Sequence, residues 1–389
     1  MMRDHYAGRD VRRAVNVEDL RRMARRRLPN FSFEYVEGGA EDEVTLRRNR
    51  DVFERITWVP RTLAGVGPPD MGVEIYGRPW HLPIAIAPTG FNGLLWPQGD
   101  LALAKAAATA GIPFTLSTVS NYSLAQLARE VPGPHWFQLY PVKDEKVVDG
   151  LIDRARDAGC EAMMVTTDVP IFGAREWDQR NYRAPLKLTL PNVLDVLAHP
   201  RWLREVMLPN GAPKFENLLE FLPPGSQSAM VGAKYMGTQI NSRLSWEDIA
   251  RMRERWKGKL ILKGILSVDD ARRAAESGVD GIVLTNHGGR QLDSCVSAIE
   301  VLPAITAEVG SRLTVLVDGG FRRGSDILKA LALGAHGVLV GRAVLYGLAA
   351  GGEAGASHAI NLLRTEMERT MTLLGCRTIA EVGRHLIRS

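Results

Sequence analysis

Eight short runs of apolar and β-branched residues recur along the chain, and their spacing limits the fold more than any other feature of the sequence. Glycine or proline bounds these runs, and segments of helical periodicity separate them. Six of the seven intervals between their starts measure 21 to 33 residues, close to the length of one βα unit. The pattern predicts an α/β protein whose strands close into a (β/α)8 TIM barrel, with a doubly wound parallel sheet as the alternative. The predicted strands span residues 82–87, 114–117, 136–140, 162–166, 260–263, 281–285, 314–318 and 337–341.

The remaining interval, between the fourth and fifth predicted strands, is 98 residues long. It predicts a long insertion between strand 4 and helix 4, over about residues 169–242. The insertion is rich in apolar residues, above all in segments 193–208 and 215–222. One interpretation is a lid buried against the barrel mouth or another subunit. The other is a monotopic segment that binds a membrane surface. Composition alone favours the lid.

Helical segments precede the first predicted strand. Asn16 has the features of a helix cap, and helices are expected over residues 16–27, 31–37 and 42–53. The expected organisation is an N-terminal helical arm and lead-in over residues 1–80, a barrel over residues 81–355 and a C-terminal helical tail over residues 356–389.

The net charge of +5 is concentrated at the N-terminal end, where residues 1–27 hold nine arginines and four acidic residues. The rest of the chain is balanced, so it lacks the basic surface expected of a nucleic-acid binder. The arm is either a solvated charge run or a contact with an anionic membrane surface. No spanning segment or secretory leader is evident. Three widely spaced cysteines predict neither a disulfide framework nor a metal site, which fits a cytoplasmic protein.

Glycines and arginines follow the seventh and eighth predicted strands. Backbone N–H groups at glycine turns and the forked guanidinium of arginine both bind phosphate, and this is the usual phosphate position in such barrels. The sequence therefore predicts a site for a phosphorylated substrate or cofactor, formed by Asp318, Gly319, Gly320, Arg322, Gly341 and Arg342.

A histidine and two arginines follow other strands. His287 lies three residues before Arg290 at the end of the sixth strand, which indicates a general base beside an anion-binding group. Asp168 and Arg175 follow the fourth strand, where Asp168 is placed to orient the imidazole. Two guanidinium groups around one base point to an anionic substrate, most simply a carboxylate. Lys263 ends the fifth strand, and its burial inside a barrel requires a negative partner.

Several strings resemble the FMN-dependent L-2-hydroxy acid dehydrogenase and oxidase family, over about residues 17–380. They are NHGGRQLD, DGGFRRG, QLY, TTD with GARE, LKG and YVEGGAEDEVTLRRN. Segment 88–104 is most similar to the mandelate dehydrogenase branch, and segment 115–120 is also similar to the lactate dehydrogenase branch. The resemblance implies FMN as cofactor, a homotetramer, and oxidation of an L-2-hydroxy acid to the 2-oxo acid.

Within this family the expected reaction converts (S)-mandelate to benzoylformate and passes electrons to a quinone-type acceptor. An L-lactate dehydrogenase and an O₂-using oxidase are the alternatives. A different FMN barrel enzyme fits less well, because of the histidine–arginine spacing and because no candidate catalytic cysteine loop is evident. A non-enzymatic binding module also fits less well, because the strand ends carry a complete set of reactive groups.

The resemblance implies a role for each matching residue. His287 would be the catalytic base with Asp168 as its partner, Arg290 and Arg175 would hold the substrate carboxylate, and Lys263 would face the flavin N1–C2 carbonyl. Tyr35 and Tyr140 would line the substrate site. The other FMN contacts would be Pro88, Thr89, Gly90, Ser117, Gln138, Thr166, Thr285, Asp318, Gly319, Gly320, Arg322, Gly341 and Arg342.

Two positions and the insertion refine this expectation. Thr285 stands where the family usually has serine, and it keeps the hydroxyl. Gly90 stands where oxidase members often carry alanine, which favours a dehydrogenase. In the mandelate dehydrogenase branch the segment that corresponds to the insertion binds membrane. Together with the basic arm, this implies peripheral contact with the inner face of the cell membrane.

Overall fold

The computed structural model describes residues 6, 8–133, 135–184, 187–211, 213–222, 235 and 237–388. Eight parallel strands form a closed barrel in which β13 pairs with β4 and β7 pairs with β10. The predicted TIM barrel is therefore confirmed, and each predicted strand overlaps an observed one. The barrel strands are β4 (Ile84–Ile86), β5 (Phe114–Ser117), β6 (His135–Leu139), β7 (Ala162–Thr166), β10 (Lys259–Ile265), β11 (Gly281–Leu284), β12 (Thr314–Asp318) and β13 (Gly337–Val340).

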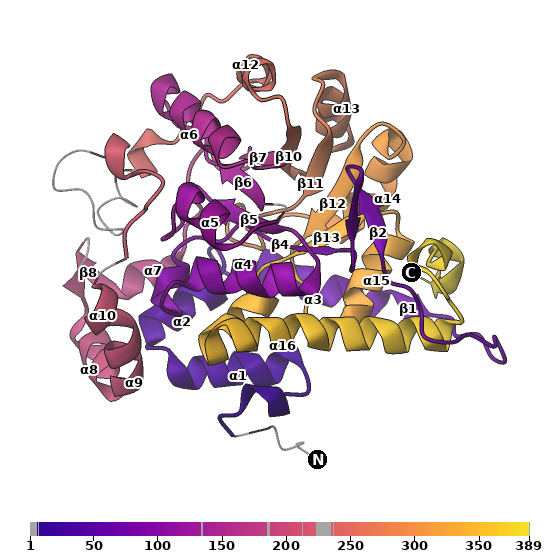
Figure 1. The fold of residues 1–389 in the computed structure, drawn as a ribbon, viewed down its shortest axis with the longest axis horizontal. Helices are drawn as coiled ribbons and strands as arrows, with labels where there is room; N and C mark the ends of the chain where they lie inside the picture. The colour runs from indigo at the N-terminus through magenta and orange to yellow at the C-terminus, as the bar shows by residue number, and fades with distance from the viewer. Residues whose placement is uncertain are drawn as a thin grey trace.

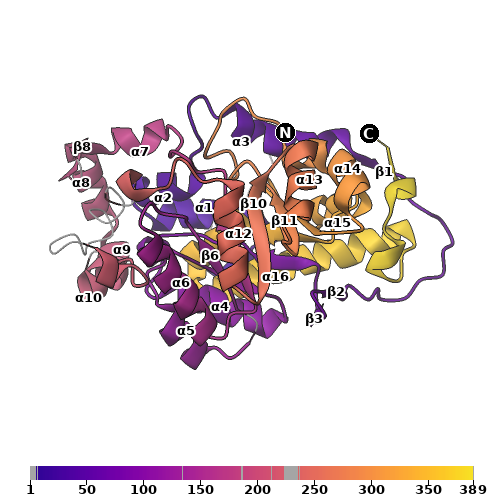
Figure 2. The same ribbon diagram turned by 90° about the horizontal axis from the view of Figure 1, so that it is seen from above.

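Helices surround the barrel (Figures 1 and 2). The longest, α16 (Arg342–Leu374), is interrupted at Gly351 and Gly352, which have non-helical backbone angles. A side chain at Gly352 would meet the ring of Trp96, so the interruption needs a glycine there. The other barrel helices are α4 (Gly99–Ala110), α5 (Leu124–Glu130), α6 (Glu145–Asp157), α12 (Trp246–Arg255), α13 (Val268–Glu276), α14 (Ala298–Val309) and α15 (Gly324–Ala332).

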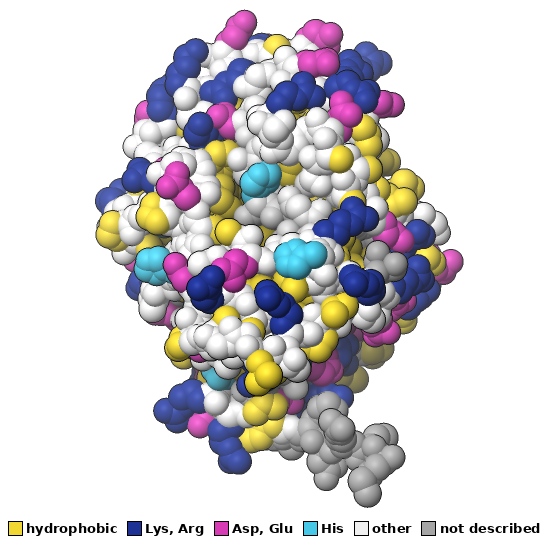
Figure 3. Space-filling model, turned by 90° about the vertical axis from the view of Figure 1, so that its right-hand side faces the viewer, with side chains coloured by type: hydrophobic (Ala, Val, Ile, Leu, Met, Phe, Trp, Pro, Cys, Tyr) yellow, Lys and Arg dark blue, Asp and Glu magenta, His cyan; other side chains and the backbone are white. Residues whose placement is uncertain are grey.

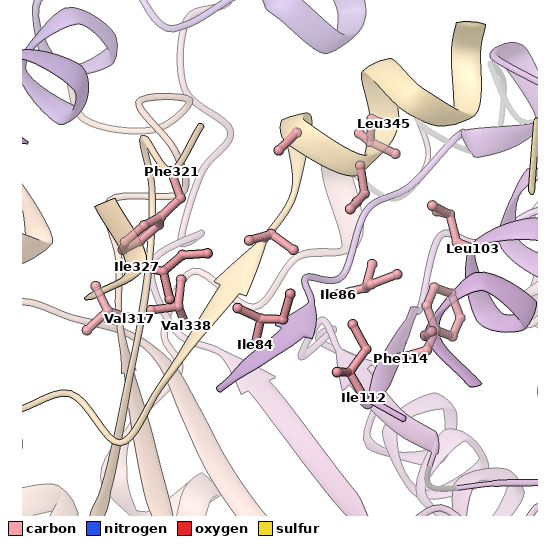
Figure 4. Packing of buried hydrophobic residues seen from close by; sticks show 14 of the residues in the cluster. Ile84, Ile86, Leu103, Ile112, Phe114, Val317, Phe321, Ile327, Val338 and Leu345 are labelled. Carbon is pink, nitrogen blue, oxygen red and sulfur yellow. The ribbon is translucent and has the colours of Figure 1, made fainter. Parts of the chain in front are cut away.

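Side chains alternate along the strands and form two hydrophobic clusters, one between the strands and the helices and one inside the barrel. Ile84 and Ile86 of β4 face the helices and pack among residues such as Leu103 and Phe114 (Figure 4). Ala85, between them, belongs to the separate cluster that fills the barrel interior. At the amino ends of the strands, the hairpin of β2 (Val73–Ile75) and β3 (Arg78–Trp80) adds apolar side chains to this inner cluster.

The three predicted N-terminal helices are present as α1 (Val17–Arg27), α2 (Asn30–Glu37) and α3 (Val44–Arg55). Asn16 caps α1 by accepting the Asp19 N–H, and α1 lies along α16 (Figure 1). The basic arm is not simply a solvated charge run. Arg21 pairs with Glu37 at 2.7 Å, and the buried Arg27 pairs with Glu205 of the insertion at 2.6 Å.

The insertion lies at one end of the molecule in both ribbon views. Trp202 is buried edge-on against Phe31 and donates its indole N–H to the Leu94 carbonyl. This part of the insertion is thus anchored on the N-terminal helices and the loop after β4. Its described elements are α7 (Glu176–Arg180), β8 (Tyr182–Ala184), β9 (Lys187–Leu188), α8 (Leu190–Ala198), α9 (Pro200–Trp202), a π-helix (Leu203–Met207), α10 (Leu208–Asn210) and η4 (Leu219–Phe221).

The side of the molecule that Figure 3 presents carries interspersed acidic and basic side chains. Within the described ranges, we find no helix with the length and apolar character needed to cross a membrane.

Asp293, from the loop after β11, caps α3 across 248 residues of sequence. Its carboxylate accepts the Thr45 N–H at 2.7 Å and the Val44 N–H at 3.2 Å, two donors that have no partner within the helix. We expect Asp293→Ala to lower the free energy of unfolding by about 1–2 kcal/mol, because it leaves both donors uncapped. Thermal unfolding of the holoprotein measures the change. Asp51→Ala, which removes an exposed carboxylate from the same helix, is the matched control. Equal effects of the two variants would contradict the capping role.

Candidate active site

A cavity of about 740 Å³ opens at the carboxyl ends of the barrel strands. Most residues predicted for the site line it. Asp168, Gln138 and Thr285 lie behind the lining and form hydrogen bonds with lining residues, and Thr166 is hydrogen-bonded to Gln138. Residues from distant parts of the sequence therefore converge as expected. The predicted residues in the lining are Tyr35, Pro88, Thr89, Gly90, Ser117, Tyr140, Arg175, Lys263, His287, Arg290, Asp318, Gly319, Gly320, Arg322, Gly341 and Arg342.

His287 and Asp168 form the predicted pair. Nδ1 of His287 lies 3.1 and 3.2 Å from the two carboxylate oxygens of Asp168. Because the carboxylate only accepts, Nδ1 carries the proton and Nε2 keeps its lone pair. The Tyr140 hydroxyl lies 3.4 Å from Nε2, within the cavity. The imidazole is therefore oriented as a base toward the cavity.

The surroundings keep the pair in this protonation state. Burial lowers the pKa of His287 below its ordinary value, and the charge of Asp168 opposes that shift. Burial alone would raise the pKa of Asp168. Its interactions with His287 and the positive charge of Lys263 outweigh burial and hold the pKa below its ordinary value. At neutral pH the site thus holds a neutral imidazole against a carboxylate.

Lys263 has the negative partner that its burial requires. Its side chain is 4% exposed, and Nζ lies 3.4 Å from Asp318 Oδ2. The other carboxylate oxygen of Asp318 accepts the Thr285 hydroxyl. A second chain of hydrogen bonds runs from Ser117 through Gln138 to Thr166, with 2.8 and 2.9 Å between donor and acceptor. These contacts fix the polar groups on the floor of the cavity.

The two arginines predicted to bind a carboxylate both line the cavity. Nε of Arg175 is buried and has no hydrogen-bond partner within the described part of the chain. Arg290 donates to the Gly38 carbonyl at 2.6 Å and lies over the ring of Tyr35. Burial, together with the charges of Arg175 and Arg342, lowers the pKa of Arg290 to about 9. A partly buried pair of guanidinium groups with an unsatisfied N–H donor is a site for an anion.

The glycine turns predicted to bind phosphate also line the cavity. Gly319 and Gly320 have φ of 100° and 88°, and a side chain at Gly320 would collide with the Asn49 carbonyl. Arg322 lies over the ring of Tyr346. Arg342 donates to the carbonyls of residues 36, 38 and 288 at 2.7 to 3.0 Å, which leaves two of its five N–H donors for a ligand.

Several residues near the site were missed by the sequence analysis. Asp178 and Tyr182 of the insertion line the cavity, as does Phe215, which is fully buried. Asn286 exchanges amide hydrogen bonds of 2.8 and 2.9 Å with Asn49 of α3 and thereby holds the loop that carries His287. Only Asn286 had a signal in the sequence, its place in the NHGGRQLD string. The insertion residues follow no periodicity that would assign them to the site.

Comparison with known proteins agrees with this geometry. A model of the FMN-dependent dehydrogenase family matches residues 24–389. The chain is 44% identical over 369 residues to (S)-mandelate dehydrogenase of Pseudomonas putida, covering 95% of this chain and 92% of that protein. It is 45% identical over 376 residues to a putative L-lactate dehydrogenase of Mycobacterium tuberculosis, covering 96% of this chain and 89% of that protein.

Solved structures agree with the sequence relatives. The monotopic membrane protein (S)-mandelate dehydrogenase superposes with a TM-score of 0.92 at 43% identity, covering 97% of this chain and 99% of that chain. A mandelate oxidase superposes with a TM-score of 0.79 at 38% identity, covering 96% of this chain and 98% of that chain.

The fold and site define a barrel enzyme that acts on a small anion with a phosphorylated cofactor. The chain belongs to the FMN-dependent dehydrogenase family, and it is an oxidoreductase acting on CH–OH groups. The predicted family, enzyme class and cofactor are confirmed. The roles assigned to single residues stay predictions.

The cavity fits FMN by its own chemistry. Its volume lies in the range of cofactor sites, glycine backbone at positions 319 and 320 permits close approach, and Arg322 and Arg342 supply positive charge. Within the described ranges, no group of acidic, histidine or cysteine side chains is arranged to hold a metal ion.

Loss of the Asp168 carboxylate tests the proton-accepting pair. We expect Asp168→Asn to slow flavin reduction by roughly 10²-fold, because the amide lacks the charge that stabilises the imidazolium and can turn its N–H₂ group toward Nδ1, which then no longer holds the proton. Since the charge of Asp168 raises the pKa of His287, its removal should also move the acidic limb of the rate–pH profile to lower pH. Stopped-flow reduction across pH measures both effects. Tyr140→Phe, which leaves the pair intact, should keep the wild-type limb. An unmoved limb in Asp168→Asn would contradict the assignment.

Proposed function

We propose that this enzyme oxidises an aryl-substituted L-2-hydroxy acid, (S)-mandelate to benzoylformate, and passes the electrons to a quinone-type acceptor at a membrane surface. The observation that carries the proposal is a neutral histidine and two partly buried arginines in one cavity with an aromatic wall. The mandelate dehydrogenase and mandelate oxidase among the relatives support the aryl substrate.

The side chains divide the work of binding and proton transfer. Arg175 and Arg290 bind the substrate carboxylate, and the free Nε of Arg175 gains a partner. Nε2 of His287 accepts a proton from the substrate, and Asp168 stabilises the imidazolium that results. Bound FMN supplies the two-electron acceptor for the reaction. Lys263 provides a fixed positive charge beside it, with Asp318 holding the ammonium group in place.

An aromatic wall supports a substrate larger than lactate. Phe91 packs edge-on against Phe215 at 4.8 Å and against Tyr35 at 5.3 Å between ring centroids. All three rings line the cavity, together with Leu94 and Val119. A phenyl group buried among such rings gains the area and edge-to-face contacts that a methyl group lacks.

The surroundings of Gly90 support a dehydrogenase. A methyl group at this position would lie 2.6 Å from Cγ2 of Val119, closer than carbon atoms approach. The alanine that oxidase members often carry here therefore does not fit unless Val119 moves.

Anaerobic mixing of the purified enzyme with (S)-mandelate, L-lactate or glycolate tests the proposal through the visible absorbance of the flavin. We expect (S)-mandelate to bleach the flavin at least tenfold faster than L-lactate at equal concentration, because only mandelate has a phenyl group to pack against the aromatic wall. Phe215→Ala should reduce that preference while L-lactate still bleaches the flavin. Faster reduction by L-lactate in the wild type would assign the enzyme to the lactate dehydrogenases. Stoichiometric peroxide in air would make it an oxidase.

Helix α8 supports the membrane surface as the place of electron transfer. Leu190, Val193, Leu194 and Leu197 share one face of the helix and are 41% to 61% exposed. Basic side chains flank the helix, with Lys187 before it and Arg201 and Arg204 after it, all exposed. An apolar stripe between cations suits an anionic lipid surface, and the relative of highest structural similarity reported above is a monotopic membrane protein.

Charge on that stripe tests membrane binding. We expect the double variant Val193→Glu/Leu197→Glu to bind vesicles of phosphatidylethanolamine and phosphatidylglycerol at least tenfold more weakly, with an unchanged rate of flavin reduction by substrate. The matched control is Leu63→Glu/Leu373→Glu, since both leucines are more than 60% exposed elsewhere on the surface. Sedimentation with vesicles measures binding. Wild-type protein that ignores these vesicles would contradict the proposal.

The homotetramer, the cytoplasmic side of the membrane and the division of the chain at residues 80 and 355 stay predictions.

A further inference from the structure

A fully buried carboxylate lies behind the loop after β4. Asp100 stands in the first turn of α4 and is 1% exposed. Burial raises its pKa to about 6, and hydrogen bonds from Ser120, Asn92 and Asn121 oppose this shift. Both of its oxygens accept hydrogen bonds from N–H donors, as an ionised carboxylate does, although a buried charge is costly. The contacts of Asp100 extend beyond the helix N-terminus in two directions.

One carboxylate oxygen fixes Asn92. Asn92 donates its Nδ2 to Asp100 Oδ1 at 2.7 Å, and the same Nδ2 reaches the Thr89 carbonyl at 3.2 Å. Its Oδ1 accepts the Thr89 hydroxyl at 3.1 Å. Because the Asp100 carboxylate only accepts, it turns Nδ2 of Asn92 toward itself and the Thr89 carbonyl, which leaves Oδ1 to accept the Thr89 hydroxyl. Thr89 and its neighbours 88 and 90 line the cavity, so this branch ends at the surface expected to meet the flavin.

The other carboxylate oxygen fixes Asn121. It accepts the Asn121 N–H at 3.1 Å. The Asn121 side chain accepts the Gly93 N–H at 2.9 Å and donates to the Lys214 carbonyl at 2.8 Å. Lys214 immediately precedes Phe215, whose ring lies in the cavity wall. This branch therefore ends on the insertion, at Phe215, which packs against Phe91 in the aromatic wall.

We propose that Asp100 is a positioning residue for the reaction, since a single carboxylate sets both the flavin-facing loop around Thr89 and the insertion segment that carries Phe215. The inference rests on the proposed function in one respect: it takes the loop around Thr89 to contact the flavin and the wall that includes Phe215 to surround the substrate. Replacement by asparagine introduces an N–H₂ group among donors, so the Asn92 amide or the Asn121 backbone loses its acceptor. The loop and the wall then shift together.

The test compares holoenzymes of the wild type, Asp100→Asn and Asp100→Glu. We expect Asp100→Asn to change the visible circular dichroism of bound flavin, to shift its midpoint potential and to slow reduction by (S)-mandelate roughly tenfold or more. Asp100→Glu, which keeps two acceptor oxygens, should restore most of these properties. Dichroism and potential need no substrate, so they test the inference even if (S)-mandelate fails to reduce the wild type and the proposed function falls.

Asp19→Asn is the matched control, because Asp19 is a buried carboxylate that accepts the Val15 N–H at the start of another helix. It should lower thermal stability and leave the flavin dichroism, potential and reduction rate unchanged. Asp100→Asn with the same outcome would show a purely structural role and overturn the inference. If Asp100→Asn gives no folded holoenzyme, Asn121→Ala decides. This position is half-buried, and a wild-type flavin dichroism together with an unchanged KM would overturn the inference equally.

Discussion

Closure of the barrel is the constraint on which the whole site depends. In the closed order β7–β10–β11, a single strand separates the loop of Asp168 from the loop of His287. That strand carries Gly264, and a side chain there would lie 2.7 Å from Cβ of Asp168. The carboxylate can therefore pass over β10 to reach the imidazole only because residue 264 is a glycine with φ of 127°. The LKG string combines this permissive position with Lys263, whose charge also acts on both members of the pair.

The charges around the cavity explain why the site is built for anions. Lys263 is paired with Asp318, and the Asp168 carboxylate accepts a hydrogen bond from the neutral imidazole. The guanidinium groups of Arg175 and Arg290 line the same cavity and repel each other, and the charge of Asp178 acts on both. Repulsion between cations in a medium of low polarity is costly, and an anionic ligand removes that cost. Ligand binding should therefore contribute to stability as well as to catalysis, because only the folded state brings these arginines together.

Much of this structure could be predicted from local patterns. The spacing of β-branched runs determined the number of strands, and the residues that follow each strand had to meet at one rim once the barrel closed. Lys263 is one example: a lysine buried inside the barrel requires an acidic partner, and Asp318 is that partner. Contacts that depend on packing could not be predicted. The pairing of Asn286 with Asn49 and the burial of Phe215 in the cavity wall join segments with no shared periodicity. The sequence does not reveal that arginines of α1 form ion pairs, because their partners, Glu37 and Glu205, lie on other elements.

The composition of the insertion could not distinguish a lid from a membrane segment. Its apolar residues belong to two groups with opposite environments. Trp202 and Phe215 are buried against the N-terminal helices and the cavity, as a lid requires. The stripe of α8 repeats at intervals of three and four residues, yet it faces outward. The apolar stripe of a helix normally stabilises the helix by packing against a core, whereas the stripe of α8 is exposed. The buried group therefore fits the lid interpretation, and the exposed group fits the proposed contact with a membrane surface.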